Sequence, residues 1–104
     1  MPDHSFRDFV LDQLSGLDVD CRRMFGGEGL YLRGRFFGII FKEALYFKTD
    51  EKSRPDYVKM GSSAFKPNAR QTLKTYYEVP VDVIEDRPRL LEWAGKAAAV
   101  AKQP

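Results

Sequence analysis

Histidine and cysteine, two of the side chains that most often carry catalysis or bind metals, are almost missing from the sequence. Its 104 residues include one histidine and one cysteine. A single cysteine excludes an intrachain disulfide, and the two residues together cannot supply a structural zinc site. His4 lies near the N-terminus and has no neighbour that would make it a catalytic base. We therefore expect no catalytic residue, no metal, no cofactor and no enzymatic activity.

Long hydrophobic runs and a dominant charge are also missing. No stretch approaches the ~18 apolar residues of a membrane span, and the N-terminus lacks the basic and apolar regions of a signal peptide. Seventeen basic and 15 acidic residues leave a net charge of +2, which is too balanced to indicate nucleic-acid binding by itself. We expect a cytoplasmic protein that has no membrane partner.

What the sequence does contain is typical of one small globular domain spanning residues 1–104. It is 43% hydrophobic and 31% charged, a balance that favours a folded chain over a disordered one. Eight phenylalanines, five tyrosines and one tryptophan supply large side chains for a core. No internal repeat or low-complexity segment divides the chain.

The stretch from residue 22 to residue 48 predicts a meander of short antiparallel strands joined by tight turns. The strands are expected over residues 21–25, 30–33, 36–41 and 45–48. Arg33-Gly34-Arg35 and Lys42-Glu43-Ala44 are the predicted turns. Residues 36–41 (FFGIIF) are apolar on both faces, which indicates a central strand covered on both sides.

Three glycines, Gly26, Gly27 and Gly29, lie inside this stretch. A glycine cluster between strands indicates a bulge, a sharp bend or the close approach of another backbone. It lacks the lysine and the following hydroxyl of a phosphate-binding loop. We therefore favour a turn or bulge over a phosphate site.

The flanking segments predict helices, one further strand and a loop. A helix is expected over residues 3–15, with Asp3 or Ser5 as its cap and Gly16 at its end. Its predicted core face is Phe6, Phe9, Val10, Leu14 and Leu17. A short helix should follow a cap at Thr49 or Asp50, or begin at Pro55, and end near Met60-Gly61. Further along we expect a mobile, turn-rich loop at 61–72, a strand at 73–79, a helical turn at 82–86 and a helix from Pro88 to about Lys102.

Together these elements predict an α+β fold. It is a mostly antiparallel sheet of about five strands, with the N- and C-terminal helices packed on it. The last helix carries a broad stripe of small apolar residues, which would let it pack closely against a neighbour.

A group of arginines and tyrosines forms the candidate interaction surface. These residues flank the Gly34 turn or lie on neighbouring strands, so they can converge on one edge of the sheet. Such a face suits contacts with phosphates or bases, although arginines at sheet edges also prevent aggregation. The candidate residues are Arg22, Arg23, Arg33, Arg35, Tyr31 and Tyr76.

Other features leave alternatives open. Cys21 lies beside two arginines that would lower its pKa, but a lone cysteine in a strand is more often a small buried hydrophobe. Asp82, Glu85 and Asp86 suit either cation binding or the capping of a helix. A third hypothesis is an enzyme or small-ligand protein that uses a pocket around Cys21, Tyr31 and residues 82–86. Two copies could also pair across an unpaired edge strand, giving a homodimer.

Several of these residues together resemble the N-terminal domain of the TfoX/Sxy competence regulators. The matching residues are Arg22–Gly27 (RRMFGG), Gly29, Tyr31, Gly34, Phe37-Gly38, Leu45-Tyr46, Lys48, Tyr76–Pro80 (YYEVP), Glu85-Asp86, Leu91 and Trp93-Ala94. The resemblance covers nearly the whole chain, as a stand-alone copy of the domain. It is weakest over residues 61–72.

The resemblance implies a regulatory role. We expect a non-enzymatic protein-interaction domain that acts as a transcriptional co-regulator linked to competence (DNA uptake) genes. Its implied partners are the transcription machinery or the cyclic-AMP receptor protein. The alternative is a domain that binds nucleic acid directly through the arginine–tyrosine face of its sheet.

Overall fold

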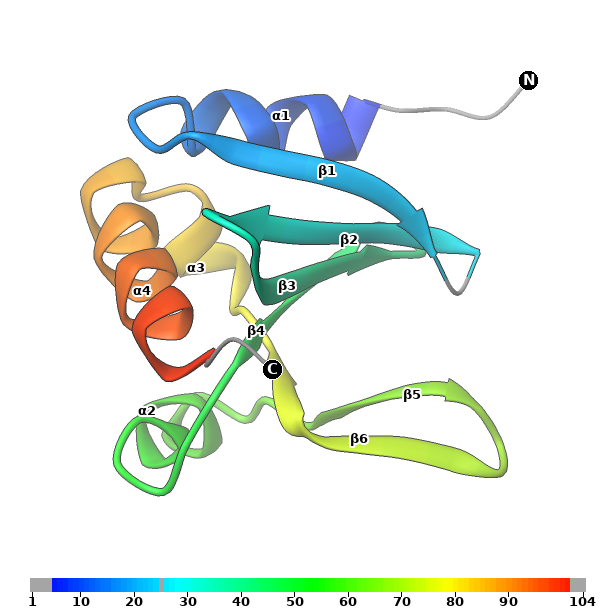
Figure 1. Cartoon of the computed structure of the whole chain (residues 1–104). Helices are drawn as coiled ribbons and strands as arrows, with labels where there is room; N and C mark the ends of the chain where they lie inside the picture. The colour runs from blue at the N-terminus through cyan, green and yellow to red at the C-terminus, as the bar shows by residue number, and fades with distance from the viewer. Residues whose placement is uncertain (1–4, 25, 102–104) are drawn as a thin grey trace.

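The computed structural model describes residues 5–24 and 26–101. The predictions made for Asp3, His4, Phe25 and Lys102 fall outside these residues. Within them, the chain forms an α+β fold in which a six-stranded antiparallel sheet carries its helices on one side (Figure 1). The predicted fold class is confirmed, with one strand more than the expected five.

The first four strands form the predicted meander, and two later strands extend it. In sheet order the strands are β1-β2-β3-β4-β6-β5. Their bounds are β1 Val19–Met24, β2 Gly27–Leu32, β3 Arg35–Phe41, β4 Ala44–Lys48, β5 Ala64–Asn68 and β6 Gln71–Glu78.

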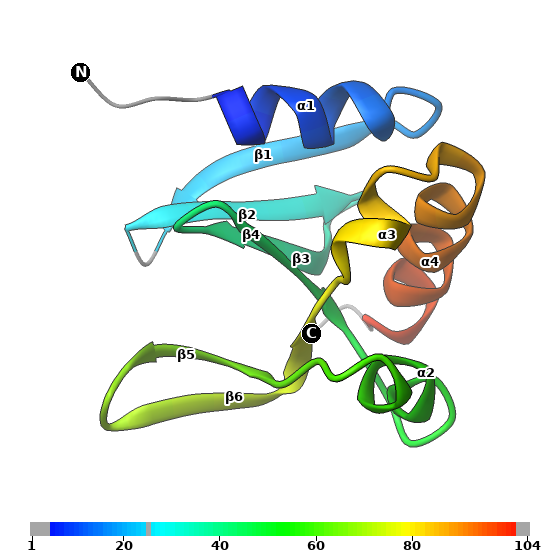
Figure 2. The same ribbon diagram turned by 180° about the vertical axis from the view of Figure 1, so that it is seen from behind.

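The loop predicted over residues 61–72 is wrong, because this stretch holds β5 and the start of β6. The two strands form a hairpin that projects away from α4 (Figure 2). Phe65 is fully buried against Phe41 and Tyr46, at ring-centroid distances of 5.2 and 4.6 Å. This long-range contact orders a segment whose glycine, proline and asparagine indicated only turns. Pro67 is tolerated because β5 is an edge strand.

Both predicted hairpin turns are confirmed. Arg33 and Gly34 join β2 to β3 with φ angles of 53° and 79°. Lys42 and Glu43 join β3 to β4 with φ angles of 49° and 61°, and Ala44 already belongs to β4. Two positive φ values in a two-residue loop match the right-handed twist of the flanking strands.

The central strand β3 is buried on both sides, as its apolar sequence predicts. Leu30 pairs with Gly38 whereas Tyr31 pairs with Phe36, so Phe37 is an extra residue in β3. This bulge turns Phe37 and Gly38 to the side of the sheet that carries the helices, which we call the helix side. The opposite side, which we call the ring side, receives Phe36, Ile39 and Phe41.

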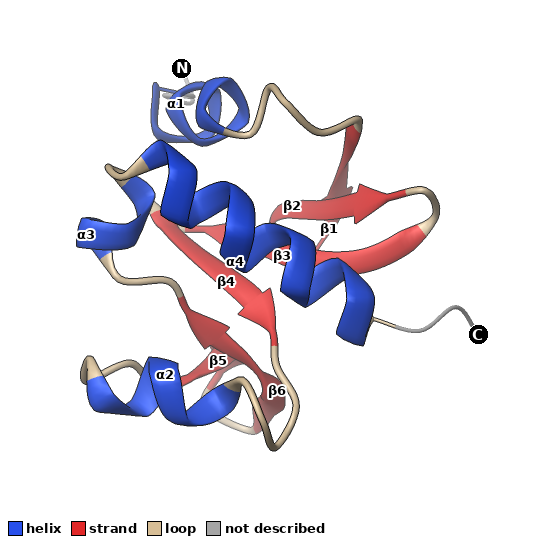
Figure 3. Cartoon of the chain, turned by 90° about the vertical axis from the view of Figure 1, so that its left-hand side faces the viewer, coloured by secondary structure: helices blue, strands red, loops and turns tan. Residues whose placement is uncertain are grey.

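Four helices accompany the sheet: α1 Ser5–Gln13, α2 Arg54–Lys59, α3 Val81–Ile84 and α4 Arg87–Val100. Figure 3 shows α4 crossing in front of the sheet, with α1 and α2 at its two sides. The main core lies beneath α4, where Phe37, Phe47 and Leu90 are fully buried. The Asp86 side chain accepts a hydrogen bond from the Arg89 N–H, so the helix-capping interpretation of this carboxylate is confirmed.

Three details of the helices differ from the prediction. Phe9 is 43% exposed, so it does not belong to the core face of α1. Gly16 follows α1 without a left-handed backbone. Neither Thr49 nor Asp50 caps α2, which begins after Ser53 with Pro55 in its first turn, the other start predicted. Asp50 instead accepts hydrogen bonds from the N–H groups of Lys52 and Ser53.

The glycines in the turn after β1 and at the start of β2 serve the turn and close-approach roles expected of them. Gly26 has a φ of 76° in the turn. A Cβ atom at Gly27 would overlap the carbonyl oxygen of Ile40, and one at Gly29 would lie 2.7 Å from the sulfur of Met24. Glycine is therefore required at residue 27, where β2 passes the β3 backbone, whereas the flexible Met24 side chain would have to move to admit a Cβ at residue 29.

This packing yields a paired stability prediction. Gly27→Ala should lower the free energy of unfolding by at least ~2 kcal/mol, because the Ile40 carbonyl belongs to the backbone and cannot rotate away. Gly95→Ala should raise it by about 0.5–1 kcal/mol, since that position lies in α4 with open space around it. Urea unfolding of both variants measures the difference. Equal effects would contradict the close approach.

Candidate functional site

Three predicted site residues meet in one row of side chains on the ring side. The rings of Tyr31, Phe36 and Tyr76 follow one another across β2, β3 and β6, at centroid distances of 5.1 and 5.1 Å. The Arg22 guanidinium lies 5.0 Å from the Tyr31 ring, and the Lys48 ammonium lies 5.1 Å from the Tyr76 ring. We call these five residues the ring row.

The side chains of the ring row are engaged with one another. Neighbouring rings and the two cations cover the ring faces. The Tyr76 hydroxyl donates a hydrogen bond of 2.9 Å to the Phe36 carbonyl, and burial raises the pKa of Tyr76, which keeps it protonated. Bases bind flat aromatic platforms through exposed ring faces. The row leaves little such face, so its charged ends are its main means of contact.

The other predicted arginines lie elsewhere. Arg33 and Arg35 line a groove of about 420 Å³ beside α4, and Arg35 donates a hydrogen bond to the Ala98 carbonyl. Arg23 is exposed on β1, opposite Glu28. The six candidate residues therefore form two separate groups and one single residue, not one surface at an edge of the sheet.

The surroundings of Cys21 contradict an activated thiol. Its Sγ donates a 3.6 Å hydrogen bond to Glu28 Oε2. Burial, followed by the charge of Glu28, raises the pKa of Cys21 to about 11. Cys21 packs against the helix-side core, whereas Tyr31 lies on the ring side. The predicted pocket containing both residues is therefore wrong, because the sheet separates them.

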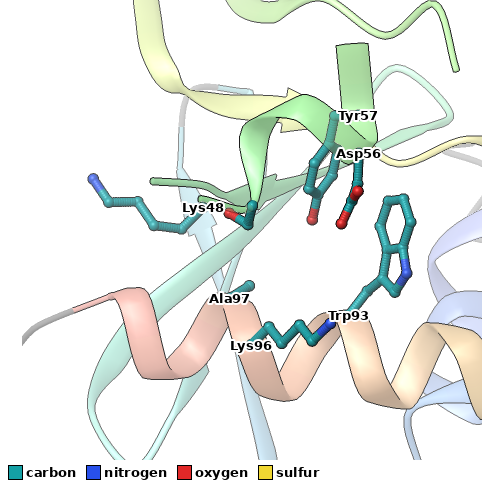
Figure 4. A pocket seen from close by; sticks show the side chains of 7 residues that line it. Lys48, Asp56, Tyr57, Trp93, Lys96 and Ala97 are labelled. Atoms are coloured by element: carbon teal, nitrogen blue, oxygen red, sulfur yellow. The ribbon is translucent and has the colours of Figure 1, made fainter. Parts of the chain in front are cut away.

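A recess between α2 and α4, missed in the sequence, is bordered by the side chain of a buried tyrosine. Tyr57 is 3% exposed, and its ring lies 4.6 Å from the Trp93 ring. Figure 4 shows its hydroxyl pointing into the space bordered by Asp56, Lys96 and Trp93, while the Lys48 side chain points away. This space is partly open and has a volume of about 10 Å³, close to the volume that one water molecule needs.

The recess opens onto the exposed side of α4. A depression of about 270 Å³ beside it is lined by Lys52, Lys96, Ala99 and Val100, among others. The 420 Å³ groove at Arg33 and Arg35 lies along the same helix and shares Ala99. We call the residues between the two hollows the α4 strip: Gly95, Lys96, Ala99 and Val100.

A sequence signal for this region exists in retrospect. Trp93, Lys96 and Ala97 have the 3/4 spacing that puts side chains on one face of a helix. Tyr57 follows Pro55 and Asp56 in a short predicted helix. This spacing does not predict that α2 packs against α4. The two helices are separated in sequence by the β5–β6 hairpin, so their contact is long-range.

Residues 5–24 and 26–101 contain neither a cluster of metal ligands nor a membrane-spanning helix. No three histidine, cysteine, aspartate or glutamate side chains lie close enough to hold a metal ion. No helix among these residues is long and apolar enough to cross a bilayer.

The Cys21 environment predicts the pH dependence of its reactivity. Because the folded-state pKa is raised to about 11, alkylation by iodoacetamide should be slow at pH ~8 and should accelerate as the pH approaches 11. An unfolded thiol ionises near pH ~8.5. The protonated thiol therefore stabilises the fold below that pH, and this contribution is lost as the pH rises through the folded pKa.

Glu28→Gln supplies the matched variant, since the Glu28 charge and its hydrogen bond both raise the thiol pKa. We expect this variant to be alkylated faster at pH ~8 while it remains folded. A wild-type thiol that reacts at pH ~8 as fast as free cysteine would contradict the buried, carboxylate-bonded geometry.

Comparison with known proteins identifies the family. A search of curated proteins found no match. The family model of the TfoX N-terminal domain matches residues 12–101, which include every strand and most of the helical residues. This is not a known family of enzymes. The chain belongs to the TfoX N-terminal domain family.

Proposed function

We propose that the chain is a non-enzymatic regulatory domain that acts by binding a partner protein. Its membership of the TfoX N-terminal domain family supports a regulatory role linked to competence. The finer proposal is a cytoplasmic transcriptional co-regulator whose partner is the cyclic-AMP receptor protein or another part of the transcription machinery. These are the partners that the family resemblance implies.

The observation that carries this proposal is the α4 strip with a hollow on each side. Gly95 and Ala99 are exposed and have little or no side chain, so a partner backbone can approach the helix closely. Arg33 and Arg35 line one hollow, and charged residues of the α2 region line the other. Apart from Lys96, the strip is apolar, and an apolar centre with a polar rim is the usual composition of a protein interface.

A binding experiment with paired variants tests the proposal. The purified chain is titrated by calorimetry with the cyclic-AMP receptor protein, with and without cyclic AMP, and then with RNA polymerase. Ala99→Glu places a charge at the centre of the strip and favours helix, so it should weaken binding at least ~10-fold without unfolding the chain. Arg35→Glu should act in the same direction.

Arg70→Glu is the control, because Arg70 is exposed at the turn of the β5–β6 hairpin, away from α4. It should bind as the wild type does. Wild-type affinity in the Ala99→Glu variant would remove the α4 strip from the interface. Absence of binding to both partners would overturn the co-regulator proposal.

Direct nucleic-acid binding is the second candidate, and one observation favours it. The ring row ends in a cation on each side, Arg22 and Lys48. Because the ring faces are covered, such binding would depend on phosphate contacts and would weaken steeply with salt. Asp20 lies 3.9 Å from Arg22 and reduces the charge available there.

Titration of labelled single- and double-stranded DNA at ~50 and ~200 mM salt checks this candidate. If the ring row binds phosphates, Arg22→Ala should weaken binding and flatten its salt dependence, whereas Arg70→Ala should not. If no binding is detected at the lower salt concentration, the candidate fails.

A further inference from the structure

We propose that β1 is an interface for a second copy of this chain. The β1 strands of the two copies pair antiparallel across a two-fold axis, so that the two sheets join into one continuous sheet. In this arrangement Asp20 of each copy lies opposite Arg22 of the other. The inference goes beyond the proposed function and does not depend on the partner that binds the α4 strip.

The sheet has two edge strands, and they differ in how well they suit further pairing. β1 and β5 lie at the two ends of the sheet order (Figure 1). β5 contains Pro67, which has no N–H, and its pairing with β6 is irregular at two places. Such features protect an edge strand from pairing with another chain. Residues 19–24 of β1 include no proline, and their register with β2 is unbroken. β1 is therefore the edge that can accept another strand.

The alternation of hydrogen bonds across the sheet identifies the backbone groups of β1 that point outwards. Leu32 pairs with Arg35 across a two-residue loop, so Leu32 directs its backbone groups to β3. The preceding residue, Tyr31, therefore directs its groups to β1, where it pairs with Asp20. Asp20 and Arg22 thus bond to β2, and the residues between and beside them point away from it. The outward set is Val19, Cys21 and Arg23.

An observed contact agrees with this assignment. The N–H of Val19 donates a 3.0 Å hydrogen bond to the Leu17 carbonyl, which lies outside the sheet. Among the described residues, no backbone hydrogen bond from another segment reaches the outward groups of Cys21 and Arg23. α1 does not pair with this edge, because it lies on the helix side with Val10 buried in the main core (Figure 3). The outward groups of Cys21 and Arg23 are therefore open to a further strand.

The charges of β1 are self-complementary in one antiparallel register. In that register Cys21 pairs with Cys21 of the second copy, and each Arg23 N–H faces the Val19 carbonyl of the other copy. Asp20 and Arg22 then face each other at the non-hydrogen-bonded positions, where cross-strand side chains lie closest. Both side chains are exposed and share the ring side of the strand. An ion pair therefore forms on each side of the two-fold axis.

The neighbouring registers lose this match. Sliding one copy by two residues is the smallest step that keeps outward backbone groups opposite each other. In one direction the slide places Asp20 opposite Asp20 of the second copy, and in the other it places Arg22 opposite Arg22. Like charges directly opposite each other destabilise a strand pair. The order of charges along β1 therefore selects a single register.

Sedimentation equilibrium of the full chain tests the proposal. The range should extend from about 10 µM to about 1 mM, because an interface formed by one pair of strands is small and binds weakly. The wild-type mass should rise from that of a monomer to that of a dimer. Arg22→Asp places two carboxylates opposite each other on each side of the axis, so it should weaken dimerisation at least ~10-fold. Asp20→Arg should have the same effect by bringing guanidinium groups together.

Exchanging the two charges tests the register. The double variant Asp20→Arg/Arg22→Asp again places opposite charges across the axis, so it should dimerise within ~3-fold of the wild type. Arg70→Asp is the control for net charge, since Arg70 is exposed at the turn of the β5–β6 hairpin. It should dimerise as the wild type does. Thermal melting of each variant confirms that it is folded.

Hydrogen exchange of backbone amides tests the location of the contact. Protection of the Cys21 and Arg23 amides should increase with protein concentration, because these groups gain partners only in the dimer. The amides of Asp20 and Arg22 are already bonded to β2, so their protection should change less.

Three results would overturn the proposal. The first is a wild-type mass that remains monomeric up to ~1 mM. The second is a dimer whose concentration-dependent protection lies in β5 or α4 and not in β1. The third is a charge-exchanged variant that dimerises as weakly as the single variants. None of these results affects the calorimetric test of the proposed function, so the two proposals fail or stand separately.

Discussion

The two-sided burial of β3 is the constraint on which the rest of the structure depends. Phe37 and Ile40 face the helices, and Ile39 faces the ring side, all of them at most 5% exposed. The bulge at Phe37 makes this arrangement possible, because it places two consecutive residues on the helix side. Gly38 is the second of these, and its missing side chain leaves room for Phe47 and Leu30. A strand covered on both sides requires two separate packing layers.

Each layer fixes one candidate surface. On the helix side, α4 is held against β3 and β4 by Leu90, Ala94 and Ala97, so Gly95 and Ala99 face outwards. On the ring side, the ring row and the β5–β6 hairpin cover the sheet with aromatic side chains. The same aromatic contacts that complete this second core occupy the ring faces. The helix side, with its hollows and small residues, is therefore better suited to a partner.

Much of the fold could be predicted because its signals are local. The two hairpin turns, the apolar β3 and the stripe on α4 each depend on residues close in sequence. The strand β5 could not be predicted, since Phe65 is buried by partners from β3 and β4. The recess at Tyr57 could not be predicted for a similar reason, because its walls come from two helices that are separated in sequence by the β5–β6 hairpin. The direction of the Cys21 pKa shift depends on burial and on Glu28, which lies on the neighbouring strand β2.

The account's central claim is that the chain meets its partner through the outward side of α4. Mapping amide chemical shifts of the isotope-labelled chain during addition of the cyclic-AMP receptor protein tests this claim most directly. We expect the largest changes in α4, α2 and the β2–β3 turn, together with the Trp93 indole signal. Changes concentrated on β1, β5 and β6, with α4 unaffected, would contradict the claim and move the interface to the ring side.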